Sequence, residues 1–563
     1  MTAKKSYRRE RKRAGRAVTR VGLLSITLAL LTSLAPSADA RFRSGALEQQ
    51  QHTVVESLAE LQARITAHIS QPRFAPAAWG IKIVSLDTGK TIFEHNAGKY
   101  FSPASNAKLF TAALALDRLG PDARIKTSIY TNGRVTSTGT VKGDLIIYGR
   151  GDPTISTRFT NGDYYSALEP LANALSLAGV RRVEGDLVGD ESYFQGSPFG
   201  WGWEWHNLQW KDGAETSALS LNENIIGLDV KPAERPGVPC RVTTDPPTRF
   251  VTLMNRTTTV PKDAKPRIAV YRPVGENVIY VSGQFPVGSA GYSGKITVHN
   301  PAGLFVSILK EVLGRRGIAV TGRARVADWK YREVTPLDLT KLRELGSIES
   351  MPVKEIVREM MKPSQNLYAQ MLLLVVGAGE KSGPEAARSR PQHSTVNTEE
   401  FDAIAAGADQ AKTTEEKGIF AMNAFLREAG IKKGEVVLEE GAGLSRANMI
   451  TPSATVELLR YMSRHRYADL YRSSLPVAGV DGTLQNRMKG TDAETNVRAK
   501  TGTLRYVSTL SGYVTTAAGE RLAFSILLNN YYNADRGHSS RDDIDLIPVL
   551  LTSFGSKSKD LSQ

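Results

Sequence analysis

The sequence predicts an α/β fold in which one domain is interrupted by a β-rich middle segment. Helical and strand-like patterns share both ends of the chain, and short β-like runs and turns fill the segment from about Thr127 to Val334. A length of 563 residues is also too great for a single hydrophobic core. We therefore expect an α/β domain formed by residues 45–127 and 336–556, with one β-rich inserted domain, or two nested ones, at 128–335.

The N-terminal residues have the pattern of an export signal. Nine Lys and Arg residues within positions 1–20 precede an apolar stretch, Val21 to Leu34, and then small residues, Ser37 to Ala40. This order predicts a signal peptide at 1–40, cleaved after Ala40, and a periplasmic or cell-surface protein. An uncleaved anchor is the alternative, but the apolar stretch is shorter than the roughly 20 residues that a spanning helix needs. We expect no other membrane span.

Charge and cysteine content exclude several classes of protein. The net charge is +15, of which residues 1–20 supply +8, so the remainder is modest and does not indicate nucleic-acid binding. The single cysteine, Cys240, excludes an internal disulfide, and we interpret it as non-catalytic. The eight histidines show no metal-ligand spacing, so neither a metal nor a cofactor is expected. The pattern makes no prediction about oligomeric state.

The periodicity of apolar residues predicts the elements in chain order. Apolar stripes predict helices, and short apolar runs between turn residues predict strands. The predicted helices are Ala46–Ile69, Phe101–Leu116, Asn300–Gly317, Pro352–Val376, Thr414–Gly430, Thr451–Arg464 and Asp543–Phe554. The predicted strands lie within Trp79–Ile92, Gly143–Tyr148, Arg182–Val188, Ile225–Val230, Arg267–Tyr271, Val278–Ser282 and Val497–Asn529, with a hairpin at Ala517–Glu520. The polar residues 379–413 predict a flexible surface insertion, and residues 557–563 a disordered tail.

The start of the helix at Phe101–Leu116 carries the first candidate catalytic residues. Ser102 is predicted to be the N-cap and Pro103 the first helical residue. Ser105 then falls in the first turn, and Lys108 follows one turn later on the same side. The positive potential at a helix N-terminus disfavours an ammonium group, so Lys108 is a candidate base for a serine nucleophile.

Two later segments offer partners for that serine. Lys500-Thr-Gly-Thr503 opens a predicted strand, where a lysine and two hydroxyls can bind a carboxylate and Gly502 lets a ligand approach the backbone. Ser364-Gln-Asn366 precedes a helix and offers a hydroxyl to relay a proton and an amide to hold a carbonyl. Each motif is weak alone, because Ser-x-x-Lys recurs twice and Ser-x-Asn once. The order of all three is more specific.

In this order of motifs the sequence resembles the low-molecular-mass class C penicillin-binding proteins, the D-alanyl-D-alanine carboxypeptidase/endopeptidase family with a large insertion between the first two motifs. About 260 residues separate Ser105 from Ser364. Two departures are Glu440-Gly-Ala-Gly443, where the family more often has Asp-Gly-Ser-Gly, and a longer insertion at 379–413. The secondary motifs that carry the resemblance are Gly149–Pro153, Gly189–Tyr193, Gly202–Trp205, Ser217–Asn224, Gly443–Arg446 and Ser474–Leu484.

The resemblance implies a penicillin-binding/β-lactamase-like transpeptidase domain and a role for each candidate. Ser105 would attack the bond between two D-alanines, with Lys108 as base and Ser364 passing the proton to the leaving amine. Asn366 would hold the peptide. Lys500, Thr501 and Thr503 would bind the terminal carboxylate, and the N–H groups of Ser105 and Thr503 would bind the oxyanion. Peptidoglycan stem peptides and β-lactams are the implied partners.

Two other functions stay open at this point. A β-lactamase-like hydrolase would need fast hydrolysis of the penicilloyl ester, and no additional deacylating base is evident in the sequence. A non-catalytic penicillin- or cell-wall-binding module would use the same cleft without turnover. The presence of every chemical residue of the three motifs favours the enzyme.

Overall fold

The computed structural model of the chain describes residues 55–379, 413–532 and 539–558. The predicted signal peptide and residues 380–412 of the predicted insertion lie outside them. Gly379 belongs to helix α8, and Thr413 is the N-cap of helix α10. In this part of the chain, no helix combines the length and apolar character that crossing a membrane requires.

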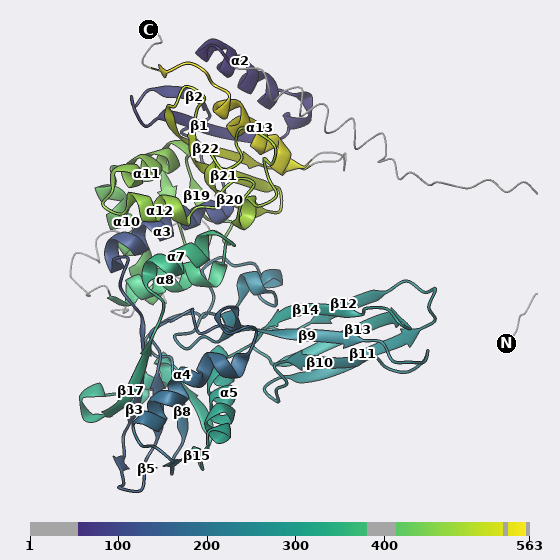
Figure 1. The fold of residues 1–563 in the computed structure, drawn as a ribbon, viewed down its shortest axis with the longest axis vertical. Coiled ribbons are helices and arrows are strands. Elements are labelled where there is room, and N and C mark those ends of the chain that lie inside the picture. Colours follow the sequence, from purple (N-terminus) through teal and green to yellow (C-terminus); the bar gives the residue numbers. More distant parts are fainter. Residues whose placement is uncertain (1–54, 380–412, 533–538, 559–563) are drawn as a thin grey trace, which may run out of the picture. The chain divides into compact units, whose positions relative to one another are not determined.

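A five-stranded antiparallel sheet unites the two ends of the described chain (Figure 1). Its order is β2-β1-β22-β21-β20, so the first strands pair with the last. One face packs against α2 and α13 in a shared core. The elements are α2 (Leu58–Ile69), β1 (Ala78–Ser85), β2 (Thr91–His95), β20 (Arg498–Leu504), β21 (Val507–Thr515), β22 (Arg521–Asn529) and α13 (Ser540–Thr552).

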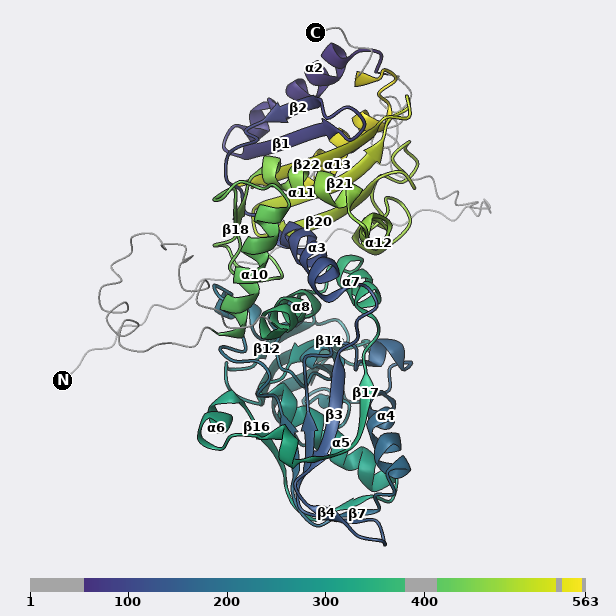
Figure 2. The same ribbon diagram turned by 90° about the vertical axis from the view of Figure 1, so that its left-hand side faces the viewer.

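The other face of this sheet is covered by helices. Buried residues of β21 and β22, such as Tyr513 and Leu527, share a core with a group of helices whose central members are α3 and α8. Figure 2 shows α8 beside α7 and α10. The elements are α3 (Ala107–Leu119), α7 (Val353–Met361), α8 (Asn366–Gly379), α10 (Thr414–Glu428), α11 (Pro452–Arg464) and α12 (Ala468–Ser474), with a short ladder of β18 (Val436–Val437) and β19 (Met449–Ile450).

The middle of the chain forms two further sheets around a separate core. Their orders are β16-β8-β6-β3-β17 and β15-β7-β5-β4, and helices α4 and α5 pack on them. The segment is therefore mixed, and the sequence analysis missed α4 and α6. The elements are β3 (Lys126–Thr131), β4 (Arg134–Val135), β5 (Thr140–Lys142), β6 (Leu145–Tyr148), α4 (Tyr164–Leu177), β7 (Arg182–Val183), β8 (Leu187–Asp190), α5 (Pro301–Arg315), β15 (Ala319–Val320), β16 (Ala324–Ala327), α6 (Trp329–Val334) and β17 (Arg343–Glu349).

Between β8 and α5 the chain forms two three-stranded sheets, which we call the strand arm (residues 225–297). Their orders are β10-β9-β14 and β11-β13-β12 (Figure 1). Buried arm residues such as Ile279 and Val281 join the core of the preceding sheets. The strands are β9 (Ile225–Lys231), β10 (Arg241–Asp245), β11 (Thr252–Val260), β12 (Arg267–Tyr271), β13 (Val278–Pro286) and β14 (Tyr292–Thr297).

The structure differs from the predicted elements at three places. Strand β17, which lies beyond the predicted end of the insertion at 335, is absent from the predicted strands and pairs antiparallel with β3 at the edge of its sheet. The helix predicted from Ala46 begins at Leu58 within the described residues, since Ser57 is extended and caps it. The tail is ordered as far as Ser558, which is 1% exposed because its N–H donates to the buried carboxylate of Glu520 at 2.9 Å.

Candidate active site

The three motifs meet in one place. Lys108 Nζ lies 2.9 Å from Ser105 Oγ, and it also donates to Asn366 Oδ1 at 2.7 Å. Lys500 Nζ donates to Ser364 Oγ at 2.8 Å. The residues come from the 3-10 turn before α3 and the first turn of α3, from the turn before α8 and the first residue of α8, and from strand β20. The structure therefore brings together side chains that lie 136 and 258 residues apart in the sequence.

The predicted helix start at Ser102 is wrong. Ser105 lies on a 3-10 turn, Ala104–Asn106, and α3 begins only at Ala107. The backbone of Ala104 has φ +46°, a left-handed conformation through which a regular helix cannot run. The Ser102 hydroxyl is buried and has no hydrogen-bond partner among the described residues, so it caps nothing.

Strand β21 holds this turn in place. Thr509 Oγ1 donates to the Pro103 carbonyl at 3.0 Å, and Asn106 Nδ2 donates to Ser511 Oγ at 2.7 Å. Two contacts that flank Ser105 therefore fix its backbone against the sheet. The left-handed conformation of Ala104 costs energy, and the surrounding contacts maintain it next to Ser105.

Burial sets the protonation of Lys108. The side chain is completely buried, and this desolvation lowers the pKa of Lys108 to about 7, although the charges of Glu440 and Asp212 oppose the shift. A lysine with that pKa is substantially neutral near neutral pH, as a general base must be. The Lys108 amine lies 2.9 Å from Ser105 Oγ and 2.7 Å from Asn366 Oδ1.

Lys500 is the second buried lysine of the site. Burial lowers its pKa well below the ordinary value, and the charge of Lys108 lowers it further. Repulsion between the two buried lysines therefore contributes to the lowered pKa of Lys500. Ser364, which accepts from Lys500, has φ +65° and is thus held in a left-handed conformation at the turn before α8.

Gly502 lies against the turn that carries Ser105. A Cβ atom built on it would be 2.9 Å from Ser105 N and 2.8 Å from the Pro103 carbonyl oxygen. Strand β20 can approach the turn this closely only because the residue has no side chain. Of its neighbours, Thr501 is buried and donates to Thr483 Oγ1 at 2.7 Å, whereas Thr503 is exposed.

The loop at Glu440 binds Lys108 through its backbone. Lys108 Nζ donates to the Ala442 carbonyl. The Glu440 carboxylate is fully buried and accepts the N–H groups of Ala442, Gly443 and the two residues that follow. A glutamate can therefore hold this turn where the family more often has aspartate, because its longer side chain folds back over the loop.

Three contacts of the site lay beyond sequence reasoning. The carbonyl oxygens of Ala442 and Asp212, which contact Lys108 and Asn366, belong to the main chain and have no side-chain signal. The sequence predicts no separate role for Thr483, which lies within the secondary motif Ser474–Leu484. Its contact with Thr501 depends on the β-bridge between Val477 and Arg498, which a single sequence does not reveal.

Comparisons with known proteins identify relatives along nearly the whole chain. Residues 61–401 and 399–549 match the D-Ala-D-Ala carboxypeptidase 3 (S13) family. A D-alanyl-D-alanine carboxypeptidase from Actinomadura is 32% identical over 540 residues, covering 93% of this chain and 89% of the relative. The D-alanyl-D-alanine carboxypeptidase DacB of Haemophilus influenzae is 25% identical over 455 residues, covering 80% of this chain and 85% of the relative.

Solved structures share the fold. The crystal structure of penicillin binding protein 4 from Haemophilus influenzae aligns with a TM-score of 0.68 at 23% identity, covering 87% of this chain and 97% of that chain. Its complex with a β-lactam aligns with a TM-score of 0.63 at 21% identity, with the same coverage. The mixed helix–sheet architecture is therefore a penicillin-binding/β-lactamase-like fold with additional sheets, as the sequence predicted.

Proposed function

The chain belongs to the D-Ala-D-Ala carboxypeptidase 3 family, and from this premise we propose that it is a serine DD-peptidase acting on peptidoglycan stem peptides. The bond cleaved is that between the two terminal D-alanines. The observation that carries the proposal is the hydroxyl of Ser105 beside the buried amine of Lys108, 2.9 Å apart. The names of the relatives support the substrate class.

Acylation begins at Ser105. Neutral Lys108 takes the hydroxyl proton as Ser105 Oγ bonds to the carbonyl carbon of the penultimate D-alanine. The oxyanion accepts hydrogen bonds from the N–H groups of Ser105 and Thr503, and losing one such donor typically costs about 3 kcal/mol of barrier. The C–N bond then breaks, and the amine leaves with a proton that Lys108 returns through Ser364. Terminal D-alanine is released, and the peptide remains as an ester on Ser105.

Hydrolysis of the ester completes the cycle. Water adds to the ester carbonyl, the C–Oγ bond breaks, and Ser105 Oγ regains its proton. β-Lactams enter the same first step: the ring amide opens and leaves a penicilloyl ester on Ser105. Because no second base for this ester is evident, we propose that the adduct persists, which distinguishes a DD-peptidase from a β-lactamase.

The substrate's terminal carboxylate defines the specificity of the site. We propose that Thr501, Thr503 and Lys500 bind it, with Thr483 supporting Thr501. Asn366 would hold the peptide by its side-chain amide. The same groups can accept the penultimate residue of a DD cross-bridge, so endopeptidase activity is a second activity of the same site.

Location and domain organisation complete the proposal. Residues 1–40 act as a signal peptide cleaved after Ala40, and the mature protein works in the periplasm or at the cell surface, where peptidoglycan lies. N-terminal sequencing of the exported protein tests this assignment. We further propose that residues 126–349 form the inserted region, with the strand arm (225–297) nested inside it, because β3 pairs with β17 and the arm lies between β8 and α5.

Mass spectrometry of the penicillin adduct tests the function. Digestion of the labelled protein should yield one peptide heavier by one penicillin, with the added mass on Ser105. Ser105→Ala should remain folded and unlabelled. Labelling of that variant, or an adduct on another residue, would show that the nucleophile is misassigned. An adduct lost within seconds would favour a β-lactamase instead.

A further inference from the structure

The segment around Asp212 contacts the side-chain amide of Asn366 in the site. Asn366 Nδ2 donates to the main-chain carbonyl of Asp212 at 2.9 Å, while Asn366 Oδ1 accepts from Lys108 Nζ at 2.7 Å. These two contacts occupy opposite ends of one amide group. Because the nitrogen only donates and the oxygen only accepts, the Asp212 carbonyl determines that Asn366 presents its oxygen to Lys108.

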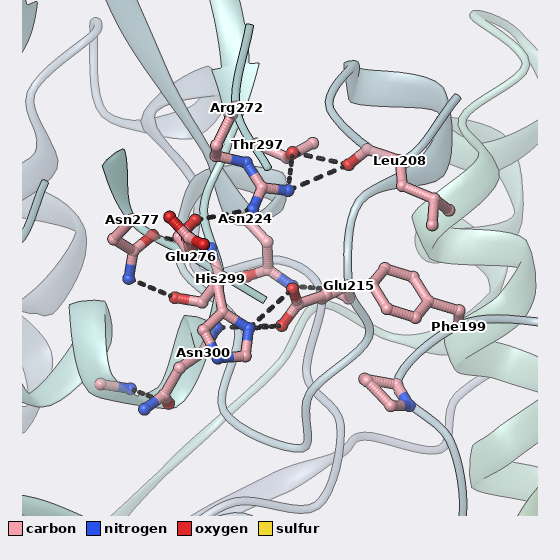
Figure 3. Close-up of polar contacts among 12 residues, drawn as sticks. Phe199, Leu208, Glu215, Asn224, Arg272, Glu276, Asn277, Thr297, His299 and Asn300 are labelled. Carbon is pink, nitrogen blue, oxygen red and sulfur yellow. Dashed lines mark hydrogen bonds and ion pairs between the residues drawn. The ribbon is translucent and has the colours of Figure 1, made fainter. Parts of the chain in front are cut away.

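The segment before Asp212 is held by the strand arm. Arg272 is 2% exposed, and its Nη2 donates to the Leu208 carbonyl at 3.1 Å. Thr297 Oγ1 donates to the same carbonyl at 2.8 Å and accepts from Arg272 Nη2 at 2.8 Å. Figure 3 shows these three residues in one group. Arg272 N also donates to the side chain of Gln209 at 3.1 Å. Several hydrogen bonds therefore hold residues 208 and 209 in place.

The segment after Asp212 is held at Glu215. The Glu215 carboxylate is buried and accepts from His299 Nδ1 at 3.0 Å and from Asn300 N at 2.9 Å (Figure 3). Asn224 Nδ2 donates to the Glu215 carbonyl at 2.7 Å. His299 and Asn300 lie between strand β14 and helix α5, so the link that directly follows the strand arm supplies these two donors.

We propose that the Arg272, Thr297 and His299 side chains act as positioning residues for the reaction: they clamp residues 208–215 on both sides of Asp212, whose carbonyl orients Asn366 beside Lys108. The proposal rests on the proposed function. Leu208 lies four residues before Asp212 and Glu215 three after it, so the turn between the clamps (Lys211–Gly213) has little freedom. The strand arm thus contributes to catalysis without contacting the substrate.

The test is the acylation rate of the full-length protein with a fluorescent penicillin. His299 is the first target, because its side chain is 42% exposed and its removal disturbs the core least. His299→Ala should lower the second-order acylation rate constant roughly tenfold, since displacement of a catalytic group by a fraction of an ångström has effects of this order. His299→Asn places a donor near the former Nδ1 position and should restore most of the rate.

A double-mutant cycle separates positioning from general damage. If His299 acts through Asn366, His299→Ala should cost less than about twofold when Asn366 is already alanine. Thr297→Val removes the contact with Leu208 at similar volume, and it should show the same dependence on Asn366. Arg325→Gln is the control: Arg325 pairs with Asp144 and Asp186 in the inserted region, away from residues 208–215, and its loss should leave the rate within twofold.

Several outcomes would overturn the inference. Wild-type rates in His299→Ala and Thr297→Val would do so, as would losses that add fully to that of Asn366→Ala. Loss of cooperative unfolding in both variants, while Arg325→Gln stays folded, would assign the cluster to stability instead. Failure of the wild-type protein to acylate at Ser105 would refute the proposed function itself, and is recognised before any variant is compared.

Discussion

Lys108 shows how its surroundings can favour the neutral form of a lysine. Its amine has three oxygen neighbours, those of Ser105, Asn366 and the Ala442 carbonyl, and none of these is charged. The nearest carboxylates act only at a distance, so burial outweighs them and the neutral form is favoured. Each acceptor orients the amine without the direct ion pair that would keep it protonated.

The acylation rate should therefore follow the deprotonation of Lys108. Because burial lowers the pKa of Lys108 to about 7, the neutral fraction and the rate should rise with pH below that value and level off above it. Measuring acylation by penicillin between about pH 5 and pH 9 checks this prediction. A rate that is constant across the range, or that falls with rising pH, would exclude Lys108 as the base.

Glu440 should influence the pH dependence of the acylation rate. Its negative charge raises the pKa of Lys108, so Glu440→Gln should move the inflection to lower pH. The neighbouring substitution Glu439→Gln removes the same charge outside the turn that binds Lys108, and it should leave the inflection in place. An unchanged inflection in Glu440→Gln, or an equal movement in both variants, would contradict this account of the buried carboxylate.

Gly502 should tolerate no side chain. A Cβ would lie 2.9 Å from Ser105 N, so Gly502→Ala must push the nucleophile's turn away from strand β20. We expect acylation to slow by about 10²-fold, the order seen when an oxyanion donor is lost, with the fold retained. Gly314→Ala, in open space on α5, is the control and should be as active as wild type. Equal rates for both alanine variants would refute the role of this contact.

At the scale of elements, sequence periodicity identified most helices and strands but not how they end. α5, α7, α8, α10 and α11 and the three C-terminal strands lie where apolar patterns placed them. Ser102 failed as a helix cap because its neighbour Ala104 adopts a left-handed conformation that tertiary contacts impose. β17 was missed because its partner strand, β3, lies about two hundred residues earlier in the sequence.

The order of the C-terminal segment Gly555–Ser558 was also not predicted from the sequence. This segment should stabilise the fold. Glu520 is buried and accepts from Ser85 Oγ at 2.5 Å and from Ser558. Ending the chain at Gly555 removes the Ser558 donors and should lower the free energy of unfolding by about 1–3 kcal/mol. Urea denaturation measures this loss. A chain ending at Ser558 keeps the contacts and is the control, and equal stability of the two would contradict the prediction.

At the scale of the whole molecule, the site depends on bringing together segments that a long insertion separates in the sequence. Residues Ser105, Ser364 and Lys500 were identifiable from the order of their motifs, because the chemistry restricts the residue types at each position. The contribution of the inserted region to the site could not be predicted in the same way. The contact is made by the Asp212 carbonyl, which accepts from Asn366, and any residue type supplies a carbonyl at that point.

The most direct test of the account is release of D-alanine from an acylated tripeptide that ends in D-Ala-D-Ala. The wild-type protein should release one D-alanine per peptide cleaved, and Ser105→Ala should release none although it remains folded. Lys108→Met, which keeps much of the side-chain volume but has no amine, should be equally inactive at every pH. Release of D-alanine by Ser105→Ala at the wild-type rate, or none by the wild-type protein, would contradict the central claim.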